Sequence, residues 1–381
     1  MSGEPVVARI GGGVASFDAA DWDACAGTGD PFLSHAFLAT LEDSGSAIGQ
    51  TGWRPLPIAI DGPDGRPAAV MPAYLKSHSL GEYVFDHGWA DAFERAGGAY
   101  YPKLQIAVPF TPVPGRRLLA RDPALAPALI AAAERVVEAN GLSSAHATFI
   151  TLAEAEMFDR AGWLIRADSQ FHWLNAGYAS FEDFLATLSS RKRKAIRKER
   201  AAAVAGLEIV HLGGDSIGEA HWDAFWAFYQ DTGARKWGHP YLTRAFFSLL
   251  GQRMAERLLL ILALRDGRPI AGALNVIGAD ALYGRYWGAT EEVPYLHFEL
   301  CYYRAIDAAI ALGLKRAEAG AQGAHKLARG YRPVPTFSAH YIADPNFRRA
   351  VADYLEAERR AVVREVAALE EMGPFRKGDR G

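Results

Sequence analysis

Asp64-Gly65-Arg66-Pro67 and Asp266-Gly267-Arg268-Pro269 are the same four residues, placed about 200 positions apart in one chain. Each tetrapeptide stands between two apolar runs, which are Leu56–Ile60 and Ala68–Leu75 in the first half and Leu258–Arg265 and Ile270–Ile277 in the second. A turn with Asp-Gly between two apolar runs is typical of a β-hairpin. The sequence therefore predicts the same hairpin twice.

Helical stretches recur around the two hairpins in the same order. Ala20–Ala24 and Ala220–Ala224 each begin a helix around a Trp-Asp pair, ahead of the hairpin. An Ala-rich amphipathic helix follows each hairpin, over Pro123–Asn140 and over Phe298–Leu312. Both of these helices are followed directly by a Gly, the residue that most often terminates an α-helix.

Two further strands complete each half. Short strands are expected at His146–Thr151 and Arg316–Ala319, and closing strands at Trp163–Asn175 and Thr336–Ala343. Strands that alternate with helices indicate a mixed α/β (α+β) architecture with helices packed on a sheet. The repeat predicts two tandem domains, residues 1–176 and 177–345, and then a docking helix at 346–372. The apolar stripe of that helix is Val351, Leu355, Val362, Val366 and Leu369.

Composition limits the class of protein. The 381 residues include 41 Lys and Arg and 44 Asp and Glu, a net charge of −3, so bulk charge does not favour nucleic acid. Cys25 and Cys301 form no CxxC pair, and we predict neither a metal site nor a disulfide framework. With no apolar run of spanning length, the expected location is the cytoplasm, with peripheral contact to the inner membrane as an alternative.

A strand followed by a Gly- and Arg-containing loop and a helix appears at Ile106–Leu119. Backbone N–H groups at a helix start, together with Arg side chains, favour a pyrophosphate. The cofactor-binding residues predicted from this loop are Val108, Thr111, Val113, Gly115, Arg116 and Arg117. The alternative interpretation is a proline-stiffened connection that carries two surface arginines.

The second half contains the densest polar cluster. Acylation of an amine needs a base to remove a proton and donors to stabilise the oxyanion. Glu299, Glu318 and His325 are the candidate bases, and Arg285 and Lys326 are candidate donors. Further substrate contacts are expected from Tyr286, Trp287, Gln322 and Arg329. Each of these residues taken alone is also compatible with a structural polar role.

The first half has a smaller counterpart of this cluster. His87 follows Asp86 directly and is a fourth candidate base. Asp86, Trp89 and Lys103 are the candidate substrate contacts there. A core or loop histidine is the competing interpretation of His87.

A basic segment, Arg191–Arg200, lies near the start of the second half. On a helix it would present positive charge on most sides. It is either a solvated surface or a contact for phosphate groups of a cofactor, an RNA end or an anionic lipid surface.

Several segments resemble known families. Ala128–Leu142 resembles the third helix of GNAT acetyltransferases, and Met157–Trp163 resembles the end of that fold's next helix. Much of the chain is similar to the FemAB-like family of predicted N-acyltransferases for peptidoglycan biosynthesis/recognition. Its most specific segments are Tyr83–Asp91, Tyr101–Pro114, Leu282–Gly288, Leu296–Tyr303 and Glu318–Tyr331. Ala324 stands where the last motif usually has Glu.

The resemblance implies two tandem GNAT-like domains that move an acyl group from an activated donor to an amine. Fem ligases take amino acids from aminoacyl-tRNA, and the similar bacterial ceramide synthases use a fatty acyl-CoA. We expect acyl-CoA as co-substrate and a small-molecule or lipid amine as acceptor, for example a sphingoid amine or a cell-envelope precursor. The alternatives are an aminoacyl-tRNA-dependent ligase, although the charged coiled-coil arm of Fem ligases is absent from this sequence, and a non-catalytic binding protein.

Overall fold

The computed structural model describes residues 7–236, 240–320, 324–371 and 374–375. The chain forms two compact units. Unit 1 contains Met1–Asp168 and Pro335–Val363, and unit 2 contains Ser169–Val334 and Arg364–Gly381. The boundaries predicted at residues 176, 345 and 372 describe the repeated segments of the sequence. The division into compact units does not test them, so they stay a prediction.

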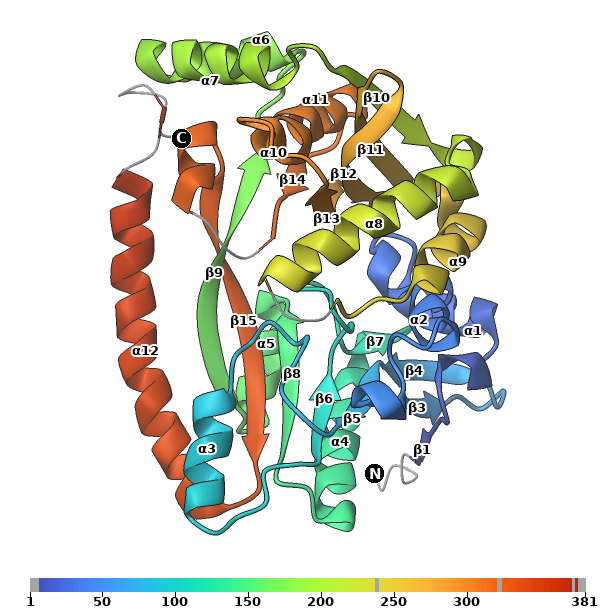
Figure 1. The fold of residues 1–381 in the computed structure, drawn as a ribbon. Coiled ribbons are helices and arrows are strands. Elements are labelled where there is room, and N and C mark those ends of the chain that lie inside the picture. The colour runs from blue at the N-terminus through green and yellow to red at the C-terminus, as the bar shows by residue number, and fades with distance from the viewer. Residues whose placement is uncertain (1–6, 237–239, 321–323, 372–373, 376–381) are drawn as a thin grey trace. The chain divides into compact units, whose positions relative to one another are not determined.

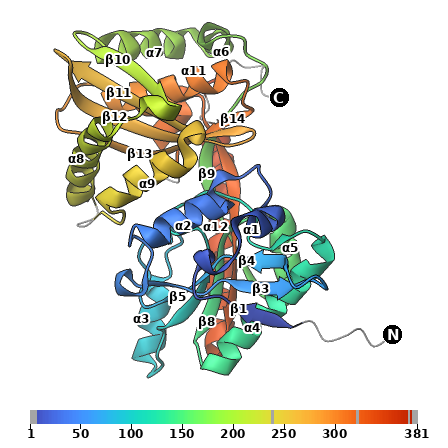
Figure 2. The same ribbon diagram turned by 90° about the vertical axis from the view of Figure 1, so that its right-hand side faces the viewer.

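Unit 1 contains two sheets (Figures 1 and 2). The smaller sheet has the order β1-β3-β4-β7, and the larger one the order β15-β8-β6-β5-β2. Only β6 and β8 run parallel to each other. The strands are β1 (Ala8–Ile10), β2 (Trp53–Pro55), β3 (Ile58–Asp61), β4 (Pro67–Met71), β5 (Ala73–Lys76), β6 (Lys103–Ile106), β7 (Leu119–Ala120), β8 (Ser144–Ile150) and β15 (Arg332–Ile342).

One face of the larger sheet is covered by apolar side chains of α4, which packs on β3, β4, β6 and β8. Every second residue of these strands faces this core, and Leu104, Ala145 and Ala339 are examples. The helices of unit 1 are α1 (Ala19–Ala26), α2 (His35–Asp43), α3 (His87–Arg95), α4 (Ala126–Asn140), α5 (Leu152–Arg160) and the first part of α12 (Pro345–Glu371).

Unit 2 is built on strands in the order β10-β11-β12-β13-β14-β9, of which only β13 and β14 are parallel neighbours. Helix α8 lies on β12 and β13 (Figure 1). The strands are β9 (Leu164–Leu174), β10 (Glu208–Gly213), β11 (Leu258–Arg265), β12 (Arg268–Ile277), β13 (Ala281–Ala289) and β14 (Arg316–Glu318). The helices are α6 (Phe181–Thr187), α7 (Ser190–Ala203), α8 (Glu219–Lys236), α9 (Arg244–Met254), α10 (Leu296–Phe298) and α11 (Arg304–Ala311).

Both predicted hairpins form, but their turns differ. In β11–β12, Arg265 pairs with Arg268, so Asp266 and Gly267 alone make the turn, both with positive φ. This is the backbone that favours Asp-Gly. In β3–β4, Asp61 pairs with Pro67 and the connection is longer. The same Asp-Gly-Arg-Pro tetrapeptide therefore connects the strands of both hairpins, but through two different turns.

The long predicted helices end as expected, at Gly141 and at Gly313, with φ of +61° and +66°. The second of them is not a uniform α-helix. It begins at Leu296 and contains a π-helical turn, Glu299–Tyr303 (η7), before α11. Such turns are rare and are frequently found at functional sites.

The closing strands are present, but their partners are exchanged relative to chain order. The end of β9, from the first half of the chain, pairs with β14 of unit 2 at Trp173 and Ala317. The end of β15, from the second half, pairs with β8 of unit 1 at His340 and His146. This exchange explains why each compact unit contains segments from both halves of the sequence.

Candidate active site

A pocket opens in unit 2 where one of two parallel strands ends. β13 and β14 pair as far as Tyr283 and Glu318, where β14 stops, while β13 continues to Ala289. Beyond that point a pocket of about 100 Å³ is present. It is lined by Ala273, Leu274, Asn275, Gly284, Arg285, Tyr286, Trp287, His297, Cys301, Tyr302 and Ala319. Its volume fits a group of a few heavy atoms, since a liquid water molecule takes up about 30 Å³.

A β-bulge shapes the wall of this pocket. Leu274 pairs with Tyr286 but Asn275 pairs with Gly284, so Arg285 is the extra residue of β13. Bulges of this kind redirect a side chain, and they recur beside active sites. A Cβ on Gly284 would lie 3.3 Å from the carbonyl oxygen of Glu318, so the absence of a side chain at this position keeps the wall open.

Two residues that line this pocket carry buried polar atoms. The side chain of Asn275 is 1% exposed, and its Oδ1 accepts no hydrogen bond from the described residues. The hydroxyl of Tyr286 is likewise without a partner there. A buried polar group without a partner costs about 1–3 kcal/mol, so a ligand that hydrogen-bonds to these atoms would regain that energy.

His325 is linked to the pocket through Tyr302. The Tyr302 hydroxyl lies 2.9 Å from His325 Nε2, and Tyr302 itself lines the pocket. Burial raises the pKa of Tyr302, which therefore remains a neutral phenol that can donate to the imidazole. The ring of His325 is exposed, so a proton taken from the pocket can pass to solvent.

Lys326 and Arg329 stabilise the turn that carries His325 through hydrogen bonds to backbone carbonyls. Lys326 Nζ donates to the carbonyl oxygens of Ala319 and Gly320, at 2.6 and 2.8 Å, and burial lowers its pKa to about 8. The Arg329 guanidinium donates to the His325 carbonyl and to Glu199, both at 2.8 Å. Both side chains are hydrogen-bonded within the protein, so we infer that they position His325 instead of contacting a substrate.

The two candidate carboxylates, Glu299 and Glu318, are each bound by arginine side chains. Both oxygens of Glu299 are bound by Arg200 at 3.0 Å, and Arg304 binds one of them at 2.7 Å, which favours a structural role. Glu318 Oε1 accepts from Arg316 at 2.8 Å. Burial raises the pKa of Glu318, although Arg316 acts in the opposite direction.

Of the other predicted contacts in the second half, Arg285, Tyr286 and Trp287 lie together at the pocket. Gln322 lies outside the described residues. Sequence reasoning missed Asn275 and Tyr302 as pocket residues. The signal for Tyr302 was its position in the helix that carries Glu299, since the π-helical turn brings Cys301 and Tyr302 to the same pocket.

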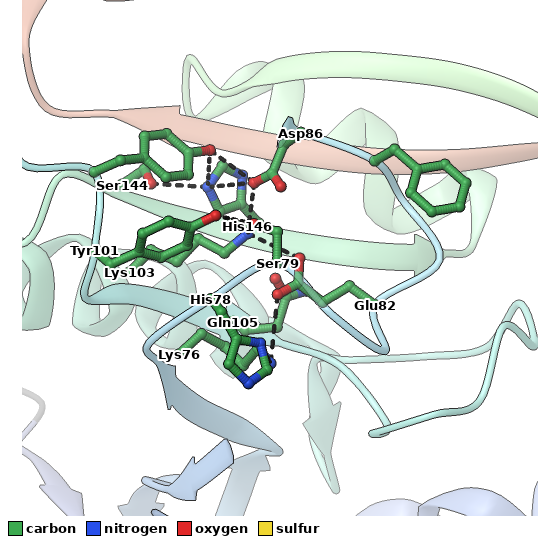
Figure 3. Close-up of polar contacts among 12 residues, drawn as sticks. Lys76, His78, Ser79, Glu82, Asp86, Tyr101, Lys103, Gln105, Ser144 and His146 are labelled. Carbon is green, nitrogen blue, oxygen red and sulfur yellow. Dashed lines mark hydrogen bonds and ion pairs between the residues drawn. The ribbon is translucent and has the colours of Figure 1, made fainter. Parts of the chain in front are cut away.

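Unit 1 contains a second polar cluster, most of it buried, and Figure 3 shows part of it. It occupies the face of the larger sheet that α4 does not cover. Lys76 ends β5 and Lys103 begins β6, and the two residues pair directly across the strands. The neighbouring strands add alternate polar side chains, which are Gln105, Ser144, His146, Thr148, Ser338 and His340.

Asp86 and Lys103, both predicted as substrate contacts, meet in this cluster. Lys103 Nζ donates to Asp86 Oδ2 at 2.5 Å and to Glu82 Oε2 at 2.8 Å. Burial alone would lower the pKa of Lys103, but the two carboxylates outweigh it and raise the pKa. The Asp86 carboxylate also accepts from the Tyr100 hydroxyl at 2.7 Å. Asp86 is therefore ionised and held in place.

Two buried histidines lie beside this ion pair. His146 Nδ1 and His340 Nδ1 are 2.7 Å apart, so one nitrogen donates and the other accepts. Burial lowers the pKa of His146 to about 3, which keeps this imidazole neutral. Trp89 packs against His340 edge to face. His87, the predicted base of this half, is exposed and stacks on Phe85.

The signal for the missed members of this cluster is an alternation of polar and small residues. Ser144-Ala145-His146 and Ser338-Ala339-His340 are identical tripeptides on neighbouring strands. Alternation usually predicts a strand with one solvated face. Here the polar face is buried as well, which a single sequence does not reveal.

The predicted pyrophosphate loop has a different geometry from the one expected. Residues 107–118 lead into β7, and α4 begins only at Ala126. The backbone N–H groups of Arg117 and Leu118 both donate to Glu154 Oε1 at 2.7 Å.

The side chains of this loop are also occupied. Val108, Thr111, Val113 and Arg117 are at most 5% exposed. The Arg117 guanidinium binds backbone carbonyls of Thr148, Arg116 and Val113, and Arg116 binds those of Cys25 and Ala26. Gly115 packs against Asp30. A pyrophosphate would have to displace these contacts, so the geometry favours a structural loop.

Two features are absent from the residues that the structure describes. No group of three or more His, Cys, Asp or Glu side chains is arranged to hold a metal ion. None of the helices is long and apolar enough to cross a bilayer.

Comparison with the solved structures of FemX and L-PGS supports the mixed α/β fold. FemX is 13% identical, with a TM-score of 0.57, and the match covers 88% of this chain and 98% of FemX. L-PGS from Bacillus licheniformis is 11% identical, with a TM-score of 0.52, covering 86% of this chain and 98% of that one. A tandem GNAT protein from the clavulanic acid biosynthesis pathway is 12% identical, with a TM-score of 0.43, covering 86% and 95%.

Comparison by sequence gives the family. The search of curated proteins found no significant match. A family model described as peptidoglycan biosynthesis/recognition matches residues 13–377, nearly the whole chain. The predicted resemblance is confirmed, and the chain belongs to the FemAB-like family.

Proposed function

We propose that this protein is an N-acyltransferase, and that an activated acyl group is passed to an amine in the pocket of unit 2. The observation that carries the proposal is the Tyr302–His325 pair, which joins a small polar pocket to an exposed imidazole. An ammonium with a pKa near 10 must lose a proton before it attacks, and this pair supplies the path for that proton.

The reaction follows from this geometry. The amine attacks the acyl carbon, and the new C–N bond forms as the amine proton passes to Tyr302 while Tyr302 gives its own proton to His325 Nε2. Arg285, at the bulge, stabilises the negative charge on the carbonyl oxygen. The bond to the leaving group then breaks, and the leaving thiolate or alkoxide takes the proton from His325 to become a thiol or hydroxyl.

Acyl-CoA is the proposed donor, and a small-molecule or lipid amine is the proposed acceptor. The donor proposal rests on the tandem GNAT-like fold, since the contacts of residues 107–118 do not support the pyrophosphate site expected there. The phosphates of acyl-CoA therefore need another binding surface.

Helix α7 favours a second candidate, transfer from aminoacyl-tRNA. Arg191, Lys194 and Lys198 are exposed on this helix. Arg197 is paired with Glu182, and Arg200 with Glu299 and Asp307. An exposed basic helix in the same unit as the pocket suits a nucleic-acid backbone.

A two-donor assay tests the proposal. The purified protein is incubated with amines, including a sphingoid base, and either with acyl-CoA thioesters of different chain length or with aminoacyl-tRNA. N-acylated products are detected by mass spectrometry. We expect product in the acyl-CoA arm. Product only in the tRNA arm supports the second candidate, and absence of product in both arms contradicts a transferase and favours a non-catalytic binding protein.

A further inference from the structure

Two lysines face each other inside the larger sheet of unit 1. Lys76 and Lys103 are directly paired residues of antiparallel strands, and both are 0% exposed. Like charges opposite each other destabilise a sheet, and burying each ion costs several kcal/mol unless it is paired. Such a pair requires anionic groups beside it.

The anions come from a single segment. Residues 77–86 connect β5 to α3 and contain no helix or strand. Glu82 and Asp86 of this segment turn inward and bind Lys103 (Figure 3). Asp86 occupies the N-cap position of α3, where Asp usually binds the helix N–H groups, yet its side chain makes no capping bond. Its carboxylate is used for the lysine instead.

The segment binds both lysines, since Lys103 Nζ donates to Ser79, Glu82 and Asp86, and Lys76 Nζ donates to the carbonyl oxygen of Leu80 at 3.0 Å. Its two carboxylates, however, are only partly hydrogen-bonded. Glu82 Oε1 and Asp86 Oδ1 are buried without a hydrogen-bond partner among the described residues. Lys76 Nζ is 3.7 Å from Glu82 Oε1, which is too far for a hydrogen bond. Burial also raises the pKa of Glu82 to about 7, although Lys103 acts in the opposite direction. A better-fitting anion could therefore replace these carboxylates.

The segment also has the properties of a part that moves. Tyr83 has a φ of +59°, a conformation that costs a non-glycine residue energy and that recurs at switch regions. Leu80 and Phe85 expose 49% and 53% of their surface, whereas Ser79, Glu82 and Asp86 of the same segment are buried. The inner side of the segment is polar and its outer side is apolar.

We propose that Lys76 and Lys103 form a binding site for a carboxylate or phosphate group of a ligand, and that Glu82 and Asp86 occupy it here as an internal substitute. Residues 77–86 are then a lid that an external anion displaces. The hydroxyls of Tyr101 and Ser144 and the ring of His146 lie around the same position and complete the site (Figure 3). This inference is independent of the reaction proposed for unit 2.

Anion binding to the whole protein tests the proposal. Calorimetry with inorganic pyrophosphate and with succinate distinguishes a phosphate ligand from a carboxylate ligand. Asp86→Asn weakens the internal competitor, so we expect affinity to rise about tenfold or more, as expected when the binding-competent state becomes more populated. Lys103→Met should abolish binding. Glu94→Gln, which removes an exposed carboxylate of neighbouring α3, is the matched control and should leave affinity unchanged.

Hydrogen exchange of the wild-type protein gives a readout that does not depend on whether a variant folds. Either anion should increase exchange in residues 77–86 and leave α4 unchanged, because displacement opens the lid alone. The proposal is overturned if neither anion binds the wild type or the Asp86→Asn variant. It is equally overturned if Lys103→Met binds as well as the wild type, or if a bound anion slows exchange in the lid.

Discussion

Replacing His325 with Gln is expected to lower the turnover number of acyl transfer about 10²- to 10⁴-fold, the usual contribution of a positioned general base. Gln can still accept a hydrogen bond from Tyr302, so the pocket should keep its shape while losing the group that takes the proton. Steady-state kinetics at saturating amine measures the effect. KM should change little, because His325 lies behind Tyr302 and does not line the pocket itself.

Tyr302→Phe provides the companion variant, since it keeps the ring and removes the hydroxyl that links the pocket to His325. It should lose activity as well, and combining it with His325→Gln should add little, because both variants break the same path. His221→Gln replaces a half-buried histidine at the start of α8, away from the pocket, and should behave as wild type. Full activity of His325→Gln would assign the proton to another group, with Glu318 the next candidate.

Replacing Lys103 with Met is expected to destabilise the protein by about 3–5 kcal/mol, the usual result of removing one partner of a buried ion pair. Met fills a similar volume, but the carboxylates of Glu82 and Asp86 are left without their main counter-charge. Lys315→Met, on the surface, should change stability very little. Urea unfolding at neutral pH measures the loss in the free energy of unfolding. Hydrogen exchange in β6 then assigns that loss to unit 1.

A double variant separates charge from packing in the same experiment. Lys103→Met combined with Asp86→Asn should recover part of the lost stability, because one uncompensated charge is removed. A Lys103→Met protein as stable as the wild type would contradict the ionised, tightly coupled cluster described for unit 1.

Local features of the fold could be predicted from sequence, and long-range pairing could not. The two Asp-Gly hairpins and the helix ends at Gly141 and Gly313 depend on a few neighbouring residues, and the structure confirms them. The exchange of β9 and β15 depends on which strands meet across more than a hundred residues. Nothing in the closing strands themselves specifies the partner.

For the candidate sites, too, local motifs could be predicted from sequence and long-range contacts could not. The polar cluster around Glu318–Tyr331 was visible as a dense motif, and its histidine does lie next to a pocket. The pyrophosphate interpretation of residues 107–118 considered Arg116 and Arg117 without their partners. Glu154 takes the N–H groups of this loop, and it stands 37 residues beyond Arg117. A loop rich in donors becomes a binding site only if the protein leaves those donors free.

The pocket of unit 2 can be tested directly through Cys301. Cys301 lines the pocket and is partly exposed, whereas Cys25, the other cysteine, is buried. Alkylation of each thiol by iodoacetamide can be followed by mass spectrometry, with and without the acyl donor that supports turnover. At a donor concentration ten times its dissociation constant, the account predicts that alkylation of Cys301 slows about tenfold. Turnover with an unchanged rate of Cys301 alkylation would contradict acyl transfer in this pocket.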